Sequence, residues 1–129
     1  MSTPPAAVAA WHRVVETRDP DLLADLLDDD CVFCSPALHR PQEGKQLTTA
    51  YLAAAMVVLG PTLTYRHEWY DASRAVLEFT AELDGRTLHG VDMLRWDEHD
   101  RLVEFTVMVR PFTGLTTLME HMAAQLQAD

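Results

Sequence analysis

Residues 89–111, HGVDMLRWDEHDRLVEFTVMVRP, form two segments of alternating apolar side chains around a polar turn at 97–100. This alternation is typical of two antiparallel strands that bury one face. Asp92 breaks the pattern, because it occupies a position that the alternation assigns to the buried face. A bare carboxylate is costly to bury. Asp92 must therefore face water, find a partner, or be kept protonated.

The strand before this stretch is placed by the hairpin signal Asp84-Gly85. A two-residue loop here joins strands over 74–83 and 86–96, and it sets Leu77 opposite Asp92. A four-residue loop at 97–100 in turn sets Asp92 opposite Phe105 on a last strand.

One face of the resulting sheet is apolar apart from its single acid, so we expect helices to cover it. The residues of this face are Leu77, Phe79, Ala81, Leu88, Gly90, Asp92, Leu94, Val103, Phe105, Val107 and Val109. The opposite face mixes charged and apolar side chains. Its apolar members, Val76, Val91, Met93, Leu102 and Met108, are numerous enough to predict a homodimer interface through this outer face.

The N-terminal half has helical periodicity instead. Prolines behind a capping residue predict helices that begin near Pro4 and Pro20, and a third helix lies between Gly44 and Gly60. A short strand over 31–35 precedes the third helix, and a final helix follows Pro111. Residues 1–129 therefore read as one α+β domain in which helices cover one side of a curved, mostly antiparallel sheet.

Composition limits the partners. The chain has 129 residues and a net charge of −10, which disfavours nucleic acid and anionic membrane surfaces. No apolar run approaches the ~20 residues that span a bilayer. The N-terminus has no basic segment before its apolar residues, so we expect no signal peptide and a cytoplasmic location. We expect Cys31 and Cys34 to be free thiols.

Three short sequence patterns indicate a family resemblance: LADLLDDDCVFCSP, EGKQLTTAYL and the stretch 89–111. No single pattern is specific, but their order and spacing together are. Through them the chain resembles the SnoaL-like and ketosteroid isomerase-like branch of the nuclear transport factor 2-like superfamily. The resemblance implies a cone in which three N-terminal helices and a C-terminal helix pack on a curved sheet. It also implies a pocket between helices and sheet, and dimers formed through the outer face of the sheet.

The resemblance also assigns roles to three residues. Asp92 occupies the place of the isomerase's protonated aspartate, which donates a hydrogen bond to an oxyanion. Ser35 stands where the isomerase has its general-base aspartate, and Trp11 stands where it has a tyrosine donor. A serine without a partner is a poor base, so steroid isomerisation by that mechanism is not expected.

The candidate catalytic residue is Asp92. We expect the pocket to bind a small hydrophobic molecule through Trp11, Ser35, Tyr51, Phe79, Asp92, Phe105 and Val107. The sequence does not fix whether Tyr65, His67 and Trp69 also face the pocket. The six histidines lack the spacing of metal ligands, so we expect no metal and no cofactor.

Three functions remain open. The first is a non-catalytic domain that binds a small apolar molecule, with Asp92 recognising one polar group. The second is an isomerase, cyclase or dehydratase that uses Asp92 as an acid or oxyanion donor. The third is a dimeric interaction domain in which Asp92 only satisfies a neighbouring polar group. The fold by itself does not choose among them.

Overall fold

The computed structural model describes residues 3–127, which fold into four helices and a six-stranded sheet. In chain order the elements are α1 (Ala6–Thr17), α2 (Pro20–Leu26), β1 (Leu27–Cys34), β2 (Gln42–Glu43), α3 (Lys45–Leu59), β3 (Thr64–Tyr70), β4 (Arg74–Leu83), β5 (Arg86–Trp96), β6 (Leu102–Arg110) and α4 (Phe112–Leu126). No helix within residues 3–127 has both the length and the apolar character needed to cross a membrane.

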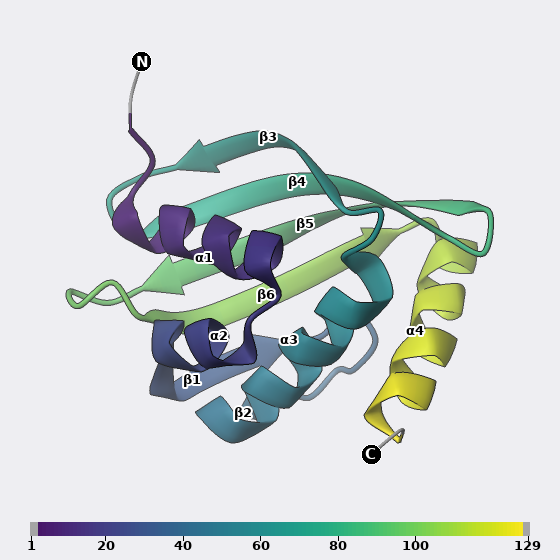
Figure 1. The fold of residues 1–129 in the computed structure, drawn as a ribbon, viewed down its shortest axis with the longest axis horizontal. Coiled ribbons are helices and arrows are strands. Elements are labelled where there is room, and N and C mark those ends of the chain that lie inside the picture. Colours follow the sequence, from purple (N-terminus) through teal and green to yellow (C-terminus); the bar gives the residue numbers. More distant parts are fainter. Residues whose placement is uncertain (1–2, 128–129) are drawn as a thin grey trace.

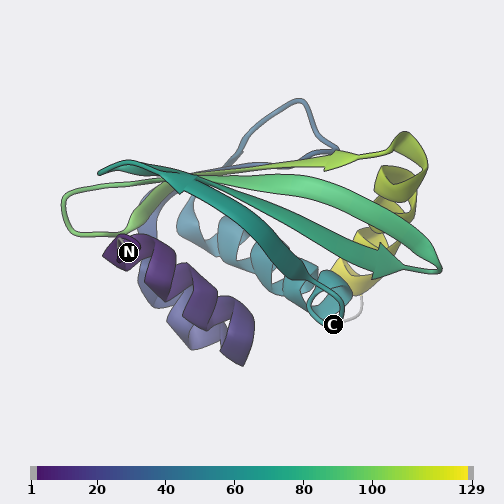
Figure 2. The ribbon, with the colours of Figure 1, turned by 90° about the horizontal axis from the view of Figure 1, so that it is seen from above.

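The strands lie in the order β2-β1-β6-β5-β4-β3. Strands β4, β5 and β6 pair antiparallel as predicted, β3 extends this meander by pairing with β4, and β1 adds to it parallel to β6. Helices α1, α2 and α3 cover one side of the twisted sheet, while α4 packs across one end (Figures 1 and 2). The α+β fold with helices on one face is therefore confirmed.

The core lies between this inner face and the helices. Side chains of Leu77, Phe79, Leu88 and Phe105 are all fully buried there. They alternate along β4, β5 and β6 with side chains that point outward, as the sequence pattern predicts. Their burial under α1, α3 and α4 removes apolar surface from water, which is the main term that holds the two layers together.

The register of β6 differs from the prediction. Asp92 pairs with Leu77 as expected, but on its other side it faces Val107, not Phe105. Arg101 belongs to the turn, where its carbonyl accepts from the amide of Asp97. A bulge near the start of β6 inserts one more residue. The longer turn shifts the pairing of β5 with β6 by one residue, and the bulge shifts it by one more. Because the total shift is even, Phe105 and Val107 keep their inward orientation. The bulge also buries Leu102, which was predicted to face outward.

The N-terminal half departs from the prediction in smaller ways. Strand β1 covers Leu27–Cys34, so it begins four residues before the predicted strand and includes Asp28, Asp29 and Asp30. The two-residue strand β2 was not predicted, because two residues carry no periodicity. The predicted free thiols of the two cysteines are confirmed, with Cys31 buried.

Candidate functional site

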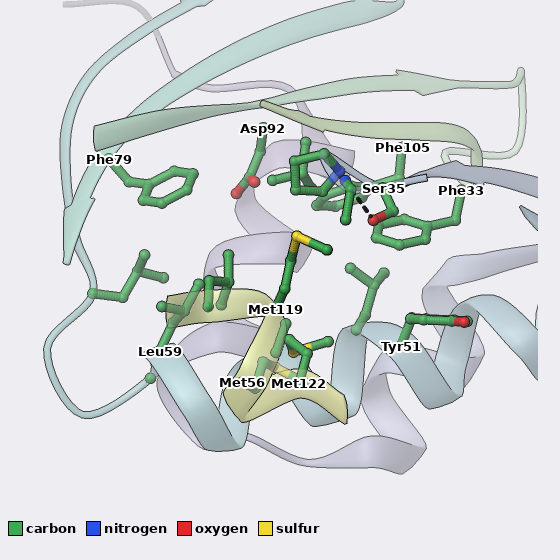
Figure 3. Close-up of a pocket in the computed structure, with 18 of the residues that line it drawn as sticks. Phe33, Ser35, Tyr51, Met56, Leu59, Phe79, Asp92, Phe105, Met119 and Met122 are labelled. Atoms are coloured by element: carbon green, nitrogen blue, oxygen red, sulfur yellow. Dashed lines mark hydrogen bonds between the residues drawn. The ribbon is translucent and has the colours of Figure 1, made fainter. Parts of the chain in front are cut away.

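A cavity of about 250 Å³ opens between the inner face of the sheet and helices α1, α3 and α4 (Figure 3). Its volume lies just below the roughly 300 to 1,000 Å³ that is usual for small-molecule sites. Most of the wall is aliphatic or aromatic. The side chains that bring polar atoms to it are Trp11, Ser35, Tyr51, Tyr65 and Asp92.

All seven residues predicted to bind a ligand line this cavity, although they come from distant parts of the chain. They are Trp11 on α1, Ser35 after β1, Tyr51 on α3, Phe79 on β4, Asp92 on β5, and Phe105 and Val107 on β6. Contact of these side chains with a ligand stays a prediction.

Asp92 points from the middle of β5 into the cavity (Figure 3). Its side chain is only 6% exposed. Burial raises the pKa of Asp92 from 3.8 to about 7, and a hydrogen bond from Tyr65 opposes that rise. Within residues 3–127, Asp92 is the one carboxyl that lines the cavity. Near neutral pH, this group is therefore poised between its charged and neutral forms.

Two aromatic side chains hold one oxygen of this carboxyl. The Tyr65 hydroxyl donates to Asp92 Oδ2 over 2.6 Å, and Trp11 Nε1 donates to the Tyr65 hydroxyl oxygen over 2.8 Å. An indole N–H can only donate, so Tyr65 accepts from Trp11 and directs its own proton to Asp92. Burial, followed by the charge of Asp92, raises the pKa of Tyr65 well above its ordinary value. Tyr65 therefore stays a neutral donor.

The orientation of Tyr65 is decided by a bulge in β3. The pairing of β3 with β4 shifts between Tyr65 and His67, so that the strict alternation of inward and outward side chains breaks there. Tyr65 faces the cavity, while His67 and Trp69 face solvent, with Trp69 58% exposed. Sequence alternation predicts one orientation for all three residues, so it gives no signal for this arrangement.

Gly90 makes room for the aromatic wall beside Asp92. A Cβ atom at this position would lie 2.6 Å from Phe79 Cζ and 2.4 Å from the backbone oxygen of Met108. Neither approach is sterically possible without movement. The missing side chain thus leaves space for the ring of Phe79 next to Gly90.

Ser35 and Tyr51 contribute hydroxyls elsewhere on the wall. Ser35 Oγ accepts the amide of Ala37 over 3.1 Å, which shapes the loop after β1. The ring of Tyr51 stacks on Phe33 with centroids 5.8 Å apart. His39, which lies in the same loop as Ser35, is not among the residues that line the cavity.

A second carboxyl occupies the opposite face of the sheet. Glu78 Oε1 lies 2.7 Å from His67 Nδ1, and Glu78 Oε2 lies 2.7 Å from His89 Nε2. These hydrogen bonds lower the pKa of Glu78.

Across the described part of the chain, no cluster of three or more His, Cys, Asp or Glu side chains is placed to hold a metal ion.

Comparisons with known proteins agree with this architecture. A SnoaL-like domain family model matches residues 8–105. A steroid delta-isomerase from Pseudomonas aeruginosa is 36% identical, with a TM-score of 0.91 over 98% of this chain and 97% of that chain. An uncharacterised protein with a cystatin-like fold from Silicibacter pomeroyi is 25% identical, with a TM-score of 0.89 over 96% and 87%.

More distant structures share the fold alone. A protein from Mesorhizobium loti described as NTF2-like and of unknown function is 20% identical, with a TM-score of 0.70 over 81% of this chain and 91% of that one. No curated protein matches the sequence significantly. Because the family model spans most of the sequence and a relative shares 36% identity over almost all of it, the chain belongs to the SnoaL-like domain family of the nuclear transport factor 2-like fold.

Proposed function

We propose that the protein binds a small, largely apolar molecule in the cavity and that Asp92 holds one polar group of that molecule. The observation that carries this proposal is a single carboxyl in a wall that is otherwise almost wholly apolar. Apolar surface supplies affinity in such sites, and a few convergent polar atoms supply orientation. Met56, Met119 and Met122 add flexible side chains that adapt to ligand shape.

The test is a calorimetric titration with para-substituted phenols of graded acidity at pH 8. In the wild type we expect affinity to rise with phenol acidity, because an ionised Asp92 accepts a stronger hydrogen bond from a more acidic donor. In Asp92→Asn we expect binding to persist with this dependence lost. Glu78→Gln makes the same chemical change outside the cavity and serves as the control. The proposal would be contradicted if affinity depended on phenol acidity equally in the wild type and in Asp92→Asn. Absence of binding would contradict it as well.

A second function, acid–base catalysis at Asp92, is supported by the placing of its two oxygens and by its pKa of about 7. Tyr65 fixes Oδ2, which leaves Oδ1 for a ligand. A group with such a pKa both takes and returns a proton at neutral pH. Isomerisation, cyclisation and dehydration need this step, and the relative from Pseudomonas aeruginosa carries the name of an isomerase.

The base position of the two-carboxyl isomerases holds Ser35 here, so Asp92 would carry the proton in both directions. Exchange of the α-protons of 2-tetralone for deuterium, followed by NMR, measures this directly. We expect the wild type to accelerate exchange over buffer, with a rate that increases as pH rises through about 7. Asp92→Asn should lose the acceleration. If both proteins exchange the ketone at the buffer rate, the catalytic proposal fails and the binding proposal stands.

We also propose that two copies associate through the outer face of the sheet. Trp69 and Met108 are 58% and 54% exposed there, which is unusual for side chains this large and apolar. Pairing this face with a second copy would remove both from water. Sedimentation velocity should show a dimer for the wild type and a monomer for Met108→Lys. A wild type that sediments as a monomer at micromolar concentration would exclude this interface.

A further inference from the structure

The polar corner of the cavity is already occupied by the protein itself. The only hydrogen of Trp11 Nε1 is donated to Tyr65, and the only hydroxyl hydrogen of Tyr65 is donated to Asp92 Oδ2. The Tyr65 oxygen thus lies between an indole donor and a carboxyl, where the oxygen of a bound phenol would otherwise fit. Of the polar atoms in this corner, Asp92 Oδ1 has no bond to Trp11 or Tyr65.

The ring of Tyr65 is held in this place by its neighbours. Its centroid lies 6.3 Å from that of Phe79 and 5.0 Å from that of His12, both in edge-to-face geometry. His12 in turn pairs with Glu68, which lies on the same strand as Tyr65. These contacts come from α1, β3 and β4, so the phenol is a fixed part of the cavity wall.

We propose that Tyr65 acts as a built-in occupant of this corner and makes the site select ligands that donate a hydrogen bond, alcohols or phenols, over ligands that only accept one, such as ketones. This selectivity rests on the proposed binding function. A ligand hydroxyl can donate to Asp92 Oδ1. When Asp92 is ionised, a carbonyl buried in the same corner meets no free donor, because Trp11 and Tyr65 have none left, and it loses its hydrogen bonds to water without replacement.

Three probes of similar shape test the selectivity by calorimetry at pH 8, where Asp92 is largely ionised. They are 2-naphthol as donor, 2-tetralone as acceptor and 2-methylnaphthalene as apolar reference. For the wild type we expect 2-naphthol to bind about tenfold more tightly than the reference, the value of one net hydrogen bond. We expect 2-tetralone to bind no more tightly than the reference.

Tyr65→Phe should relax the selectivity. The variant keeps the ring and frees the Trp11 N–H, which can then donate to a carbonyl. We expect 2-tetralone to bind roughly tenfold more tightly than in the wild type. The double variant Trp11→Phe/Tyr65→Phe should lose this gain, because the freed donor is gone. Tyr70→Phe removes a phenol hydroxyl from a tyrosine of the same strand that does not line the cavity, and it should leave the ratio of the naphthol and tetralone affinities unchanged.

The outcomes separate the selectivity from the function on which it rests. Equal affinity of the wild type for 2-naphthol and 2-tetralone, or an unchanged affinity ratio in Tyr65→Phe, overturns the role of Tyr65 while the cavity remains a binding site. The same shift in Tyr70→Phe also overturns it. If none of the three probes binds the wild type or Tyr65→Phe, the binding function itself fails. Tyr65→Phe alone decides whether Tyr65 sets the selectivity, even if Trp11→Phe/Tyr65→Phe does not fold.

Discussion

Asp92 and Glu78 lie on neighbouring, directly paired strands, yet their carboxyl groups behave in opposite ways. Leu77 faces Asp92 across the β4–β5 ladder, and the next residue of β4, Glu78, faces Val91. Burial in the cavity raises the pKa of Asp92 to about 7, whereas hydrogen bonds to two histidines lower the pKa of Glu78. One step along a strand reverses the face, and with it the surroundings that set the pKa.

The difference has a direct consequence for stability. Folding raises the pKa of Asp92, so this group stabilises the fold fully below pH 4, and the contribution is lost as pH rises toward about 7. Folding lowers the pKa of Glu78, so its contribution is present above its ordinary pKa of 4.5 and is lost as pH falls. Asp92 therefore makes the fold more stable at acidic pH, whereas Glu78 makes it less stable there.

The largest effect should come from removing the inner charge. We expect Asp92→Asn to be more stable than the wild type at pH 8 by a few kcal/mol, at about 1.4 kcal/mol for each unit of raised pKa. The gap should close as pH falls toward 4, because the wild-type carboxyl then becomes neutral. Urea unfolding between pH 4 and 8 measures both curves. Parallel curves would show that Asp92 is charged in both states and would remove the contrast with Glu78.

The next effect concerns the space beside Asp92. Gly90→Ala places a Cβ atom against Phe79 and the backbone of Met108, and we expect it to lower the free energy of unfolding by about 1 to 3 kcal/mol. Thr87→Ala, at an exposed position of the same strand, should change it by about 0.5 kcal/mol or less. Urea unfolding of both variants gives the values. Equally small changes in both variants would mean that the inner face accommodates a Cβ atom at position 90 without steric cost.

A smaller change tests what limits the pKa of Asp92. The hydrogen bond from Tyr65 lowers that pKa, so Tyr65→Phe should shift the titration of Asp92 to higher pH. Carbon-13 NMR of the labelled carboxyl follows this titration directly. Tyr51→Phe provides the control and should leave the Asp92 titration in place. A shift to lower pH in Tyr65→Phe would mean that water takes over the hydrogen bond and enters the corner.

The smallest effect is expected on the outer face. Glu78 interacts with His67 and His89 close to solvent, where ion pairs contribute little. Glu78→Gln should leave the midpoint of thermal unfolding at pH 7 almost unchanged. Between pH 6 and 3 it should remove a small part of the acid-dependent loss seen in the wild type. If Glu78→Gln is as strongly affected as Asp92→Asn, burial is not what separates the two carboxyls.

The inward position of Asp92 was predictable because it rests on two local signals. The Asp84-Gly85 turn fixes the register of β4 and β5, and alternation of apolar residues fixes the face. Phe105 and Val107 were placed on the correct face although their register was wrong by two residues, since an even shift preserves orientation. Phe79, Asp92, Phe105 and Val107 line one cavity for this reason, because each prediction required only the correct face of the sheet. Trp11 and Ser35 were placed there by the family resemblance instead.

Tyr65 could not be predicted in this way. Its orientation depends on a bulge, and a bulge leaves no periodic mark in a sequence. Its hydrogen bonds join residues 54 and 27 positions apart, which no local pattern connects. Strand β2 and the parallel placement of β1 were missed because pairing partners depend on the whole sheet.

The chain of hydrogen bonds from Trp11 through Tyr65 to Asp92 also bears on the order of events during synthesis. Trp11 leaves the ribosome long before Tyr65, so its indole has no hydrogen-bond partner until Tyr65 has emerged. Contacts between residues this far apart form late in folding. The nascent protein thus carries an ordinary charged aspartate, and the pKa of Asp92 rises only when the fold closes over β5 and buries its carboxyl.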